Sequence, residues 1–325
     1  MAVDIKSLKV AVLMGGIGEE RQVSLESGKC VSQALKKSDV NVVTSDITPE
    51  NMEILDDDSI DVFFLALHGR FGEDGDLQRI MEDKGLIYTG SGPEASRLAF
   101  DKIACKKTFV EAGIDTPAMI EIKNEADLKE LEKQLQGFAD KYVVKPVRQG
   151  SSVGISIVNK AFQAVAAAQN VLREFGDCMI EKFIPGREIT VGILCGEILP
   201  LIEVRPKTAF YDYHAKYIAD STEYLFDTVK DAAMETAIGQ TAKNCFNALG
   251  LRDFARIDVI VGEDKKIYAL EANTIPGFTT HSLLPKAAAK VGFPMADLCI
   301  RIIEAALKRE HKNKCLVARS PRRSP

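Results

Sequence analysis

Short runs of apolar residues recur along the first hundred positions, and segments with helical spacing of apolar residues separate them. Four strands are predicted, at residues 8–14, 40–45, 62–67 and 86–88. Strands that alternate with helices usually form a parallel sheet covered on both faces. This part of the chain therefore predicts a doubly wound parallel sheet of the α/β class. Helical spacing then predicts one helix over residues 93–113, and we place a domain boundary near Leu98.

The pattern changes after residue 99. Up to residue 185, helices are predicted at residues 126–135 and 161–175, between strands at residues 142–145, 154–158 and 178–183. The remainder predicts strands at residues 188–194, 197–203, 255–261 and 266–272, with helices at residues 229–249 and 295–308. Both parts are typical of α+β domains, and no repeat of 20 to 50 residues is present.

The 325-residue chain is 46% hydrophobic and 27% charged, which is typical of a folded soluble protein and excludes a mainly disordered one. No apolar run is long enough to cross a membrane, and the N-terminus lacks the apolar core of a signal peptide. We therefore expect a cytoplasmic protein with no membrane association. The cysteines lie far apart without zinc-ligand spacing, so we interpret them as reduced thiols.

The net charge of −5 is unevenly distributed. Residues 307–325 carry seven lysines and arginines, with Glu310 as their only acidic residue. A short basic end that is rich in serine and proline is typically a solvated, disordered tail. Contact with nucleic acid or an anionic surface is the alternative for this tail, but nothing in the rest of the chain predicts a nucleic-acid partner.

A predicted hairpin near the end of the chain carries the most informative polar residues. Alternation along its strands puts Arg256 and Asp258 on one face, and it does the same for Glu271 and Asn273. A turn centred between residues 264 and 265 would place Asp258 opposite Glu271. Opposed carboxylates destabilise a hairpin unless a positive charge lies between them.

These oxygen ligands, without histidine or thiolate, suit a hard cation such as Mg²⁺. The amide of Asn273 would supply a third oxygen. The alternative is a solvated polar face on which Arg256 pairs with one carboxylate.

Residues 145–154 form a loop rich in glycine and serine between two predicted strands. Its backbone N–H groups and hydroxyls could bind phosphate oxygens, with Lys145 as a cation at the strand end. It is not a Walker A loop, because Ile155 follows Gly154 and no helix begins there. A plain hairpin turn is the alternative.

Two further segments are candidates for a ligand site. Residues 15–21 form a glycine-rich turn after a strand, but Arg21 replaces the third glycine of a dinucleotide fingerprint, so a NAD site is not expected. The turn leaves the carboxylate of Glu20 unexplained, and His68 ends a neighbouring strand. Residues 210–217, with three tyrosines, suit a loop that covers a site; a surface loop with stacked tyrosines is the alternative.

These features occur together in one family. They are Gly15-Gly16, Glu20-Arg21-x-Val23-Ser24, Leu67-His68-Gly69, Tyr88-Thr89-Gly90-Ser91-Gly92, Asp101-Lys102, Val144-Lys145-Pro146, Gly150-Ser151-Ser152-Val153-Gly154, Tyr211-Asp212-Tyr213, Ala215-Lys216-Tyr217, Arg256-Ile257-Asp258 and Glu271-Ala272-Asn273-Thr274. The chain resembles the D-alanine:D-alanine ligases of the ATP-grasp superfamily from about residue 9 to residue 307. The resemblance implies ATP-dependent formation of D-alanyl-D-alanine, through a D-alanyl phosphate, for peptidoglycan precursor synthesis.

The resemblance also implies the division of the chain and the cofactors. The expected parts are an N-terminal Rossmann-like domain (1–98), a central ATP-grasp domain (99–186), a C-terminal ATP-grasp domain (187–311) and the basic tail (312–325). The expected ATP ligands are Lys102, Lys145, Ser152, Glu181, Lys182 and Glu188. Two Mg²⁺ ions, or Mn²⁺, would bind Asp258, Glu271 and Asn273.

Further roles follow from the resemblance alone. Glu20 would bind the ammonium group of the first D-alanine beside His68, and Glu20, Ser151 and Tyr217 would form a hydrogen-bonded set. Lys216 would neutralise the transferring phosphoryl group. The remaining expected contacts are Arg256 and the Gly277 N–H as an oxyanion hole, with Ser282 and Leu283 at the second substrate.

Tyr217 favours D-alanine as the second substrate, because relatives that form an ester with D-lactate commonly carry histidine there. A ligase for D-serine or D-lactate is the alternative enzyme, and a binding protein without turnover is the alternative outside enzymes. His214 and Gln22 depart from the family pattern, which usually has glutamate at both positions. A homodimer is expected from the resemblance only.

Overall fold

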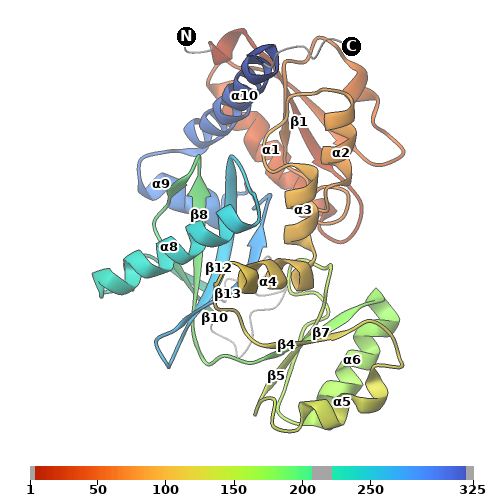
Figure 1. The fold of residues 1–325 in the computed structure, drawn as a ribbon. Helices are drawn as coiled ribbons and strands as arrows, with labels where there is room; N and C mark the ends of the chain where they lie inside the picture. Colours follow the sequence, from red (N-terminus) through yellow and green to blue (C-terminus); the bar gives the residue numbers. More distant parts are fainter. Residues whose placement is uncertain (1–3, 207–221, 320–325) are drawn as a thin grey trace.

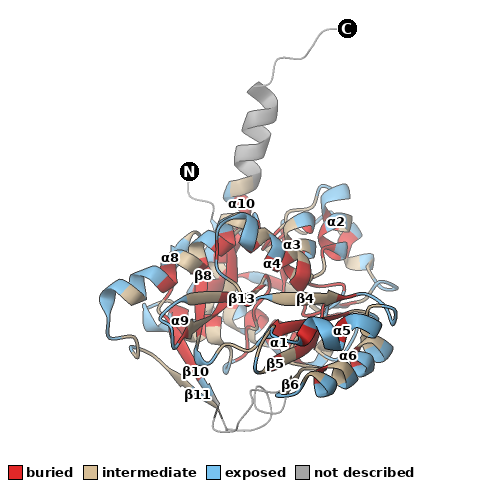
Figure 2. Cartoon of the chain, turned by 60° about the horizontal axis from the view of Figure 1, so that its bottom comes forward, coloured by how far each residue is buried: buried red, intermediate tan, exposed pale blue. Residues whose placement is uncertain are grey.

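The computed structural model describes residues 4–206 and 222–319, which form three sheets flanked by helices (Figure 1). Two short 3-10 helices, η1 (Ile5–Ser7) and η2 (Glu53–Asp56), belong to the N-terminal part. Figure 2 shows buried residues along the strands and exposed residues on the outer sides of the helices. None of the described helices is both long and apolar enough to span a membrane.

A parallel sheet in the order β2-β1-β3 consists of β1 (Lys9–Gly15), β2 (Asn41–Ile47) and β3 (Val62–Leu65). Successive residues of a strand point to opposite faces. Val10 and Val12 of β1 pack in one core with α1 (Arg21–Lys37) and α10 (Met295–Arg319). Ala11 and Leu13 pack in another core with α2 (Asp76–Asp83). Helices therefore cover both faces of this sheet, as predicted.

Two expectations for this region were wrong. The expected strand at residues 86–88 is a single bridge between Phe63 and Tyr88. The expected helix over residues 93–113 is two helices, α3 (Pro93–Phe100) and α4 (Lys102–Glu111). They separate at Asp101, whose backbone is extended and whose carboxylate accepts the Ala104 N–H at 2.9 Å. An aspartate at this position caps a new helix, so Lys102 lies at the start of α4.

A four-stranded antiparallel sheet has the order β4-β7-β5-β6, formed by β4 (Met119–Ile122), β7 (Cys178–Lys182), β5 (Tyr142–Pro146) and β6 (Ser156–Val158). Its helices, α5 (Leu128–Leu135) and α6 (Ala161–Phe175), pack on the face that contains Val144 and Ile180. By alternation, Lys145 and Glu181 point to the other face, toward α4.

The third sheet contains β8 (Gly186–Leu194), β9 (Glu197–Ile198), β10 (Ile202–Pro206), β11 (Thr222–Leu225), β12 (Phe254–Gly262) and β13 (Ile267–Asn273). The strand expected at residues 197–203 is divided into β9 and β10, and Pro200 between them has no N–H for a ladder. The helix α8 (Ala232–Ala248) packs on this sheet through Ile238 and Ala242, and α9 (Leu283–Lys290) follows the sheet in sequence.

The hairpin of β12 and β13 has the predicted pairs at its open end, where Asp258 opposes Glu271 and Arg256 opposes Asn273. Beyond them the register shifts by one residue, so the turn is not centred between residues 264 and 265 as expected. Lys265 has a φ of 64° in the turn, and a β-bulge at Leu270 restores the pairing.

β13 is an edge strand, and the segment between α4 and β4 crosses its outer side. The Ala269 N–H donates to the carbonyl of Asp115 at 2.8 Å, and the Thr116 hydroxyl donates to the Ala269 carbonyl at 2.7 Å. The N–H and carbonyl of Ala269, which point away from β12, are therefore hydrogen-bonded within the chain.

The last helix, α10, packs on α1, so the C-terminal end of the chain completes the N-terminal core. Arg309 of α10 binds both carboxylate oxygens of Asp253, at 2.7 and 2.5 Å, and donates to the Tyr88 carbonyl at 2.7 Å. The helix continues to Arg319, past the expected end at residue 308 and into the expected tail, because no glycine or proline follows before Pro321.

Candidate active site

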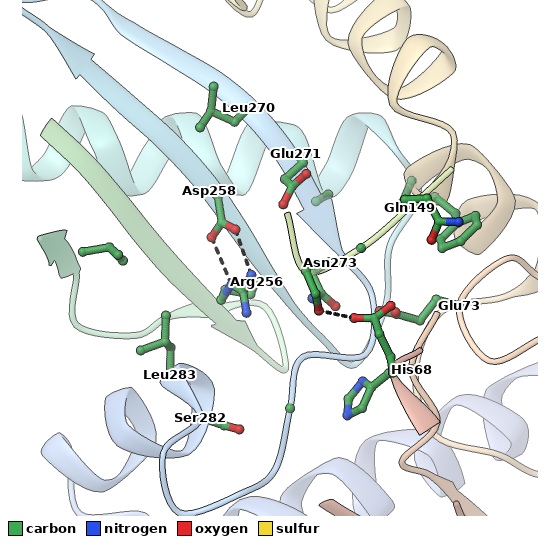
Figure 3. Close-up of a pocket in the computed structure, with 18 of the residues that line it drawn as sticks. His68, Glu73, Gln149, Arg256, Asp258, Leu270, Glu271, Asn273, Ser282 and Leu283 are labelled. Atoms are coloured by element: carbon green, nitrogen blue, oxygen red, sulfur yellow. Dashed lines mark hydrogen bonds and ion pairs between the residues drawn. The ribbon is translucent and has the colours of Figure 1, made fainter. Parts of the chain in front are cut away.

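One pocket lies where the three sheets meet, and twelve of the eighteen residues expected at the site line it. They are Glu20, His68, Lys102, Ser151, Glu188, Arg256, Asp258, Glu271, Asn273, Gly277, Ser282 and Leu283. They come from the loops after β1, β3 and β5, from the start of α4, from the strands β8, β12 and β13, and from residues 277–283. Figure 3 shows those of β12 and β13 with His68, Ser282 and Leu283. Residues 230 or more positions apart therefore share one site.

The other six expected residues lie elsewhere. Lys145 and Glu181 are buried beside the pocket, and Lys182 is exposed at the end of β7. Ser152 lies in the loop after β5 with a φ of 60°. Lys216 and Tyr217 fall outside the described residues, together with His214 and the expected covering loop.

Glu20 and Ser151 connect the N-terminal sheet to the loop after β5. The Ser151 hydroxyl donates to Glu20 Oε1 at 2.5 Å. Two glycines allow the carboxylate to lie there, because a Cβ at Gly150 or Gly69 would come within 2.5 or 2.8 Å of Glu20 Oε2. Ser151 itself has a φ of 51°, in the left-handed region where residues other than glycine are strained. Such strain is common in loops that bind ligands.

His68 and Glu73 form the buried end of the pocket (Figure 3). His68 Nε2 lies 3.1 Å from the Ser27 hydroxyl, and burial lowers the pKa of His68, which favours the neutral ring. Glu73 accepts the Gly69 N–H at 2.7 Å and the Ile275 N–H at 3.3 Å. Burial, and then the charge of Glu20, raise the pKa of Glu73 to about 8.

Arg256 and Asp258 form a bidentate ion pair on β12 (Figure 3), with distances of 3.0 and 2.8 Å. Thr190 of the adjacent strand β8 donates to the same carboxylate at 2.5 Å. Glu271 points to the same side from β13. The pairing of Arg256 with one carboxylate, which the sequence left as the alternative, is therefore present, and the two carboxylates also face each other.

The donor set fits a hard cation in its chemistry. Asp258, Glu271 and Asn273 offer oxygen atoms from two adjacent strands, which are the ligands that Mg²⁺ and Mn²⁺ accept. Within the described ranges, no three side chains of His, Cys, Asp or Glu are close enough to form a metal site alone. An ion here would take further oxygens from a bound ligand, as Mg²⁺ does with phosphates.

The β-bulge at Leu270 shapes this wall of the pocket. Ala269 and Ala272 point into the core on the far side of β13, while Leu270 and Glu271, between them, both line the pocket. Strict alternation would send one of these two side chains into the core. The bulge thus adds an apolar wall beside the carboxylate.

The loop that leads to α9 forms the opposite wall. Ser282 accepts the Thr279 N–H at 3.0 Å, and its hydroxyl lies 2.9 Å from that of Thr279. Gly277 must lack a side chain, because a Cβ there would lie 2.5 Å from Ser282 Oγ. The backbone of Gly277 is therefore accessible from the pocket that it lines.

Lys102 connects the start of α4 to the loop after β5. Its ammonium donates to the Gln149 carbonyl at 2.5 Å and lies 3.8 Å from Glu271 Oε2, and its backbone N–H donates to the Val147 carbonyl at 3.3 Å. Arg148 reaches back from the same loop to Asp101 at 2.5 Å. The loop is thus bonded to the junction between α3 and α4.

Three charged side chains form a buried cluster beside the loop that follows β5. Glu181 binds Lys106 through one oxygen and Lys145 through the other, the second at 2.7 Å. Lys145 and Glu181 were expected from the sequence, whereas Lys106 and, in the pocket, Glu73 were not. Lys106 follows Lys102 by one helical turn, and this spacing was the available signal.

The comparisons with known proteins agree with this geometry. A family model described as D-ala D-ala ligase C-terminus matches residues 108–304. The D-alanine–D-alanine ligase of Syntrophotalea carbinolica is 41% identical over 309 residues, which cover 94% of this chain and 99% of that protein. The chain belongs to the D-alanine–D-alanine ligase family.

Solved structures of the family have the same fold. The Bacillus anthracis D-alanine–D-alanine ligase is 35% identical, with a TM-score of 0.83, and the match covers 94% of this chain and all of that one. The same ligase complexed with ATP gives a TM-score of 0.79 at 33% identity, over 94% of this chain and 99% of that one. The predicted ATP-grasp fold is confirmed, and so is the resemblance to this family of ligases.

Proposed function

We propose that this enzyme joins two D-alanine molecules in the pocket described above, with the conversion of ATP to ADP and phosphate. The product, D-alanyl-D-alanine, is a precursor for peptidoglycan synthesis. The observation that carries the proposal is the convergence of Glu20, Arg256 and Asp258 on one pocket in a chain of this family. These side chains offer an anion for an ammonium group, a cation for a carboxylate, and an oxygen ligand for a metal ion.

The first D-alanine binds with its ammonium group on Glu20, which Ser151 orients. Its carboxylate oxygen attacks the γ-phosphorus of ATP, the bond from that phosphorus to the β-phosphate oxygen breaks, and ADP leaves. The acyl phosphate that forms has a carbonyl carbon with phosphate as its leaving group. No nucleophile from the protein is needed, because positioning and charge neutralisation suffice for phosphoryl transfer.

The second D-alanine binds beside Ser282 and Leu283. Its ammonium first gives a proton to water, and its nitrogen then attacks the acyl carbon. The carbon–oxygen bond to phosphate breaks, phosphate leaves, and the nitrogen releases a second proton to become the amide. Arg256 and the Gly277 N–H stabilise the oxyanion that develops on the carbonyl oxygen. Tyr217, with Glu20 and Ser151, holds the loops over the site, and its identity favours D-alanine over D-lactate as the acceptor.

ATP binds between the four-stranded and six-stranded sheets. Lys102, Lys145, Lys182 and the loop containing Ser152 act on its phosphates, with Lys216 near the transferring group. Glu181 and Glu188 act on the base and the ribose. The corresponding units are an N-terminal substrate domain (1–98), a nucleotide domain (99–186) and a metal and second-substrate domain (187–311).

Two Mg²⁺ ions, or Mn²⁺, bind at Asp258, Glu271 and Asn273. Such ions neutralise the phosphate oxygens during transfer. The chain contributes the placement of these oxygens, because the register of the hairpin and the Thr190 hydroxyl hold Asp258 opposite Glu271. In the cell the enzyme is a cytoplasmic homodimer; sedimentation of the purified protein tests its oligomeric state.

The deciding experiment measures phosphate release from ATP and Mg²⁺ with D-alanine, alone and in competition with D-serine or D-lactate, and identifies the product by mass. We expect D-alanyl-D-alanine as the main product. A different main product would retain the mechanism and overturn the argument from Tyr217. Nucleotide binding without phosphate release would favour a binding protein.

A further inference from the structure

The buried cluster of Lys106, Glu181 and Lys145 contains more positive than negative side chains. The three side chains come from α4, β7 and β5, and each is at least nine-tenths buried. They carry two positive charges and one negative charge when all are ionised. An unbalanced charge is costly in the interior of a protein, so the excess is expected to serve a negatively charged ligand.

The arrangement assigns different tasks to the two lysines. Lys106 is 1% exposed and is directed at Glu181 from the helix side. Lys145 lies on the strand that leads into the loop with Ser151 and Ser152. Glu181 has two carboxylate oxygens, and each lysine occupies one of them. Without Lys106, Glu181 would pair only with Lys145, and its negative charge would cancel the positive charge of that lysine.

We propose that Lys106 is a positioning residue for the nucleotide: by holding one oxygen of Glu181, it leaves Lys145 with positive charge for a phosphate group of ATP. The inference rests on the proposed function, since it requires that ATP binds beside Lys145. Lys106 itself would contact neither a substrate nor a metal ion. It would act on ATP through Glu181 and Lys145.

The electrostatics of the cluster are consistent with this role. Burial, and then the neighbouring charge of Lys145, lower the pKa of Lys106 to about 8, although Glu181 opposes this change. Glu181, and then Glu271, raise the pKa of Lys145 against the effect of burial. Cys105 is the other titratable group near Lys106, and burial raises the pKa of its thiol, so it stays neutral.

A pH dependence of nucleotide binding follows. An anionic phosphate at the cluster favours the protonated form of Lys106, so binding takes up protons above pH 8. The dissociation constant should then rise by up to about tenfold per pH unit above that value. The pKa of Glu73 is also raised to about 8, but Glu73 lies in the pocket beside Glu20. Because variants of Lys106 retain Glu73, a change in the pH dependence between them and wild type reports on Lys106.

The test compares the full-length wild type with Lys106→Met and, as a matched control, Lys107→Met. Lys107 is the next residue of α4, but it is exposed and pairs with Glu121 at the surface. Binding of a non-hydrolysable ATP analogue with Mg²⁺ is measured by calorimetry from pH 6.5 to 9.5. The KM for D-alanine and the circular dichroism spectrum are measured alongside.

We expect Lys106→Met to weaken analogue binding at pH 7 by about tenfold or more, with the KM for D-alanine within about twofold of wild type. The rise of the dissociation constant above pH 8 should disappear in this variant and persist in Lys107→Met. A variant of Lys106 that binds the analogue as wild type does, or that retains the full pH dependence, overturns the proposal.

Two outcomes separate this inference from the function on which it rests. If Lys106→Met does not fold, the wild-type series decides, since a dissociation constant that stays unchanged from pH 7 to 9.5 excludes a titrating Lys106. If the wild type binds no nucleotide, the proposed function fails first, and the inference fails with it.

Discussion

Glu73 is a buried carboxyl group that lies close to a second carboxylate, Glu20, at the edge of the same pocket. Two backbone N–H groups bind its oxygens, but they do not offset the loss of hydration. The group therefore stays protonated up to about pH 8 in the folded protein, whereas it ionises near pH 4.5 in the unfolded chain. Its protonation state couples the pocket to the stability of the fold.

The sign of this coupling can be predicted. Between pH 4.5 and 8 the folded state binds a proton at Glu73 that the unfolded state has lost, so stability falls as the pH rises. Glu73→Gln cannot ionise at this position. We therefore expect its free energy of unfolding to rise relative to that of wild type by up to about 1 kcal/mol for each pH unit between pH 5.5 and 7.5. Urea unfolding at several pH values measures the difference. Parallel pH curves for the two proteins would contradict the raised pKa.

Sequence patterns named most polar residues of the pocket but not its buried partners. His68 stands beside a glycine after a strand, Glu20 follows a glycine-rich turn, and Arg256 shares one face of a predicted strand with Asp258, so each polar side chain is conspicuous. Glu73 and Lys106 lie in ordinary polar segments, and their burial depends on elements far away in the chain. Burial of a charge is a property of the tertiary structure, so the sequence alone could not reveal it.

At the scale of elements, the hairpin of β12 and β13 shows which features of a hairpin the alternation of residues can predict. Alternation and opposed charges predicted the pairing of Asp258 with Glu271, because side-chain direction has a period of two in any strand. The centre of the turn was predicted between residues 264 and 265, whereas the pairing beyond the bulge centres it on residue 264. The bulge at Leu270 was not predicted. The turn contains a left-handed residue, Lys265, which has no sequence signal comparable to Asn-Gly.

The hairpin also carries the test of metal binding. We expect Glu271→Gln to raise the Mg²⁺ concentration needed for half-maximal activity by about tenfold or more, because an amide replaces a charged oxygen ligand. Titration of phosphate release with Mg²⁺ measures this. The control is Asp264→Asn in the exposed turn of the same hairpin, where the carboxylate binds Tyr268 at 2.7 Å. Equal Mg²⁺ requirements in both variants would argue against the proposed site.

At the scale of the whole molecule, the sheets differ in how they share cores. The parallel sheet, parts of the six-stranded sheet, α9 and α10 contribute to one continuous core. The four-stranded sheet has its own core with α5 and α6 and extends away from the rest in Figure 1. The unit that holds Lys145 is therefore packed more independently than the units that hold Glu20 and Asp258.

Arg309 provides a test of the shared core. Its guanidinium binds Asp253, which is 5% exposed and also accepts the Gly90 N–H at 2.9 Å. We expect Arg309→Ala to lower the free energy of unfolding by about 2 to 3 kcal/mol, because it leaves a buried carboxylate without its cation. Denaturant unfolding measures the loss, and kcat should be unchanged.

The matched control for this variant is Lys308→Ala, which removes a surface ion pair with Glu304 and should cost less than about 1 kcal/mol. If both variants were equally stable, Arg309 would not anchor the helix. A truncation that probes the basic end of the chain must retain Arg309 for the same reason.

The segment across β13 has a consequence for behaviour at high concentration. An unprotected edge strand offers its backbone groups to another molecule, and growth of sheets from such edges leads to aggregation. Asp115 and Thr116 occupy those groups at Ala269, in the middle of the strand. The chain thus blocks the outer edge of β13 at this residue, and a strand from a second molecule would have to displace the segment that leads from α4 to β4.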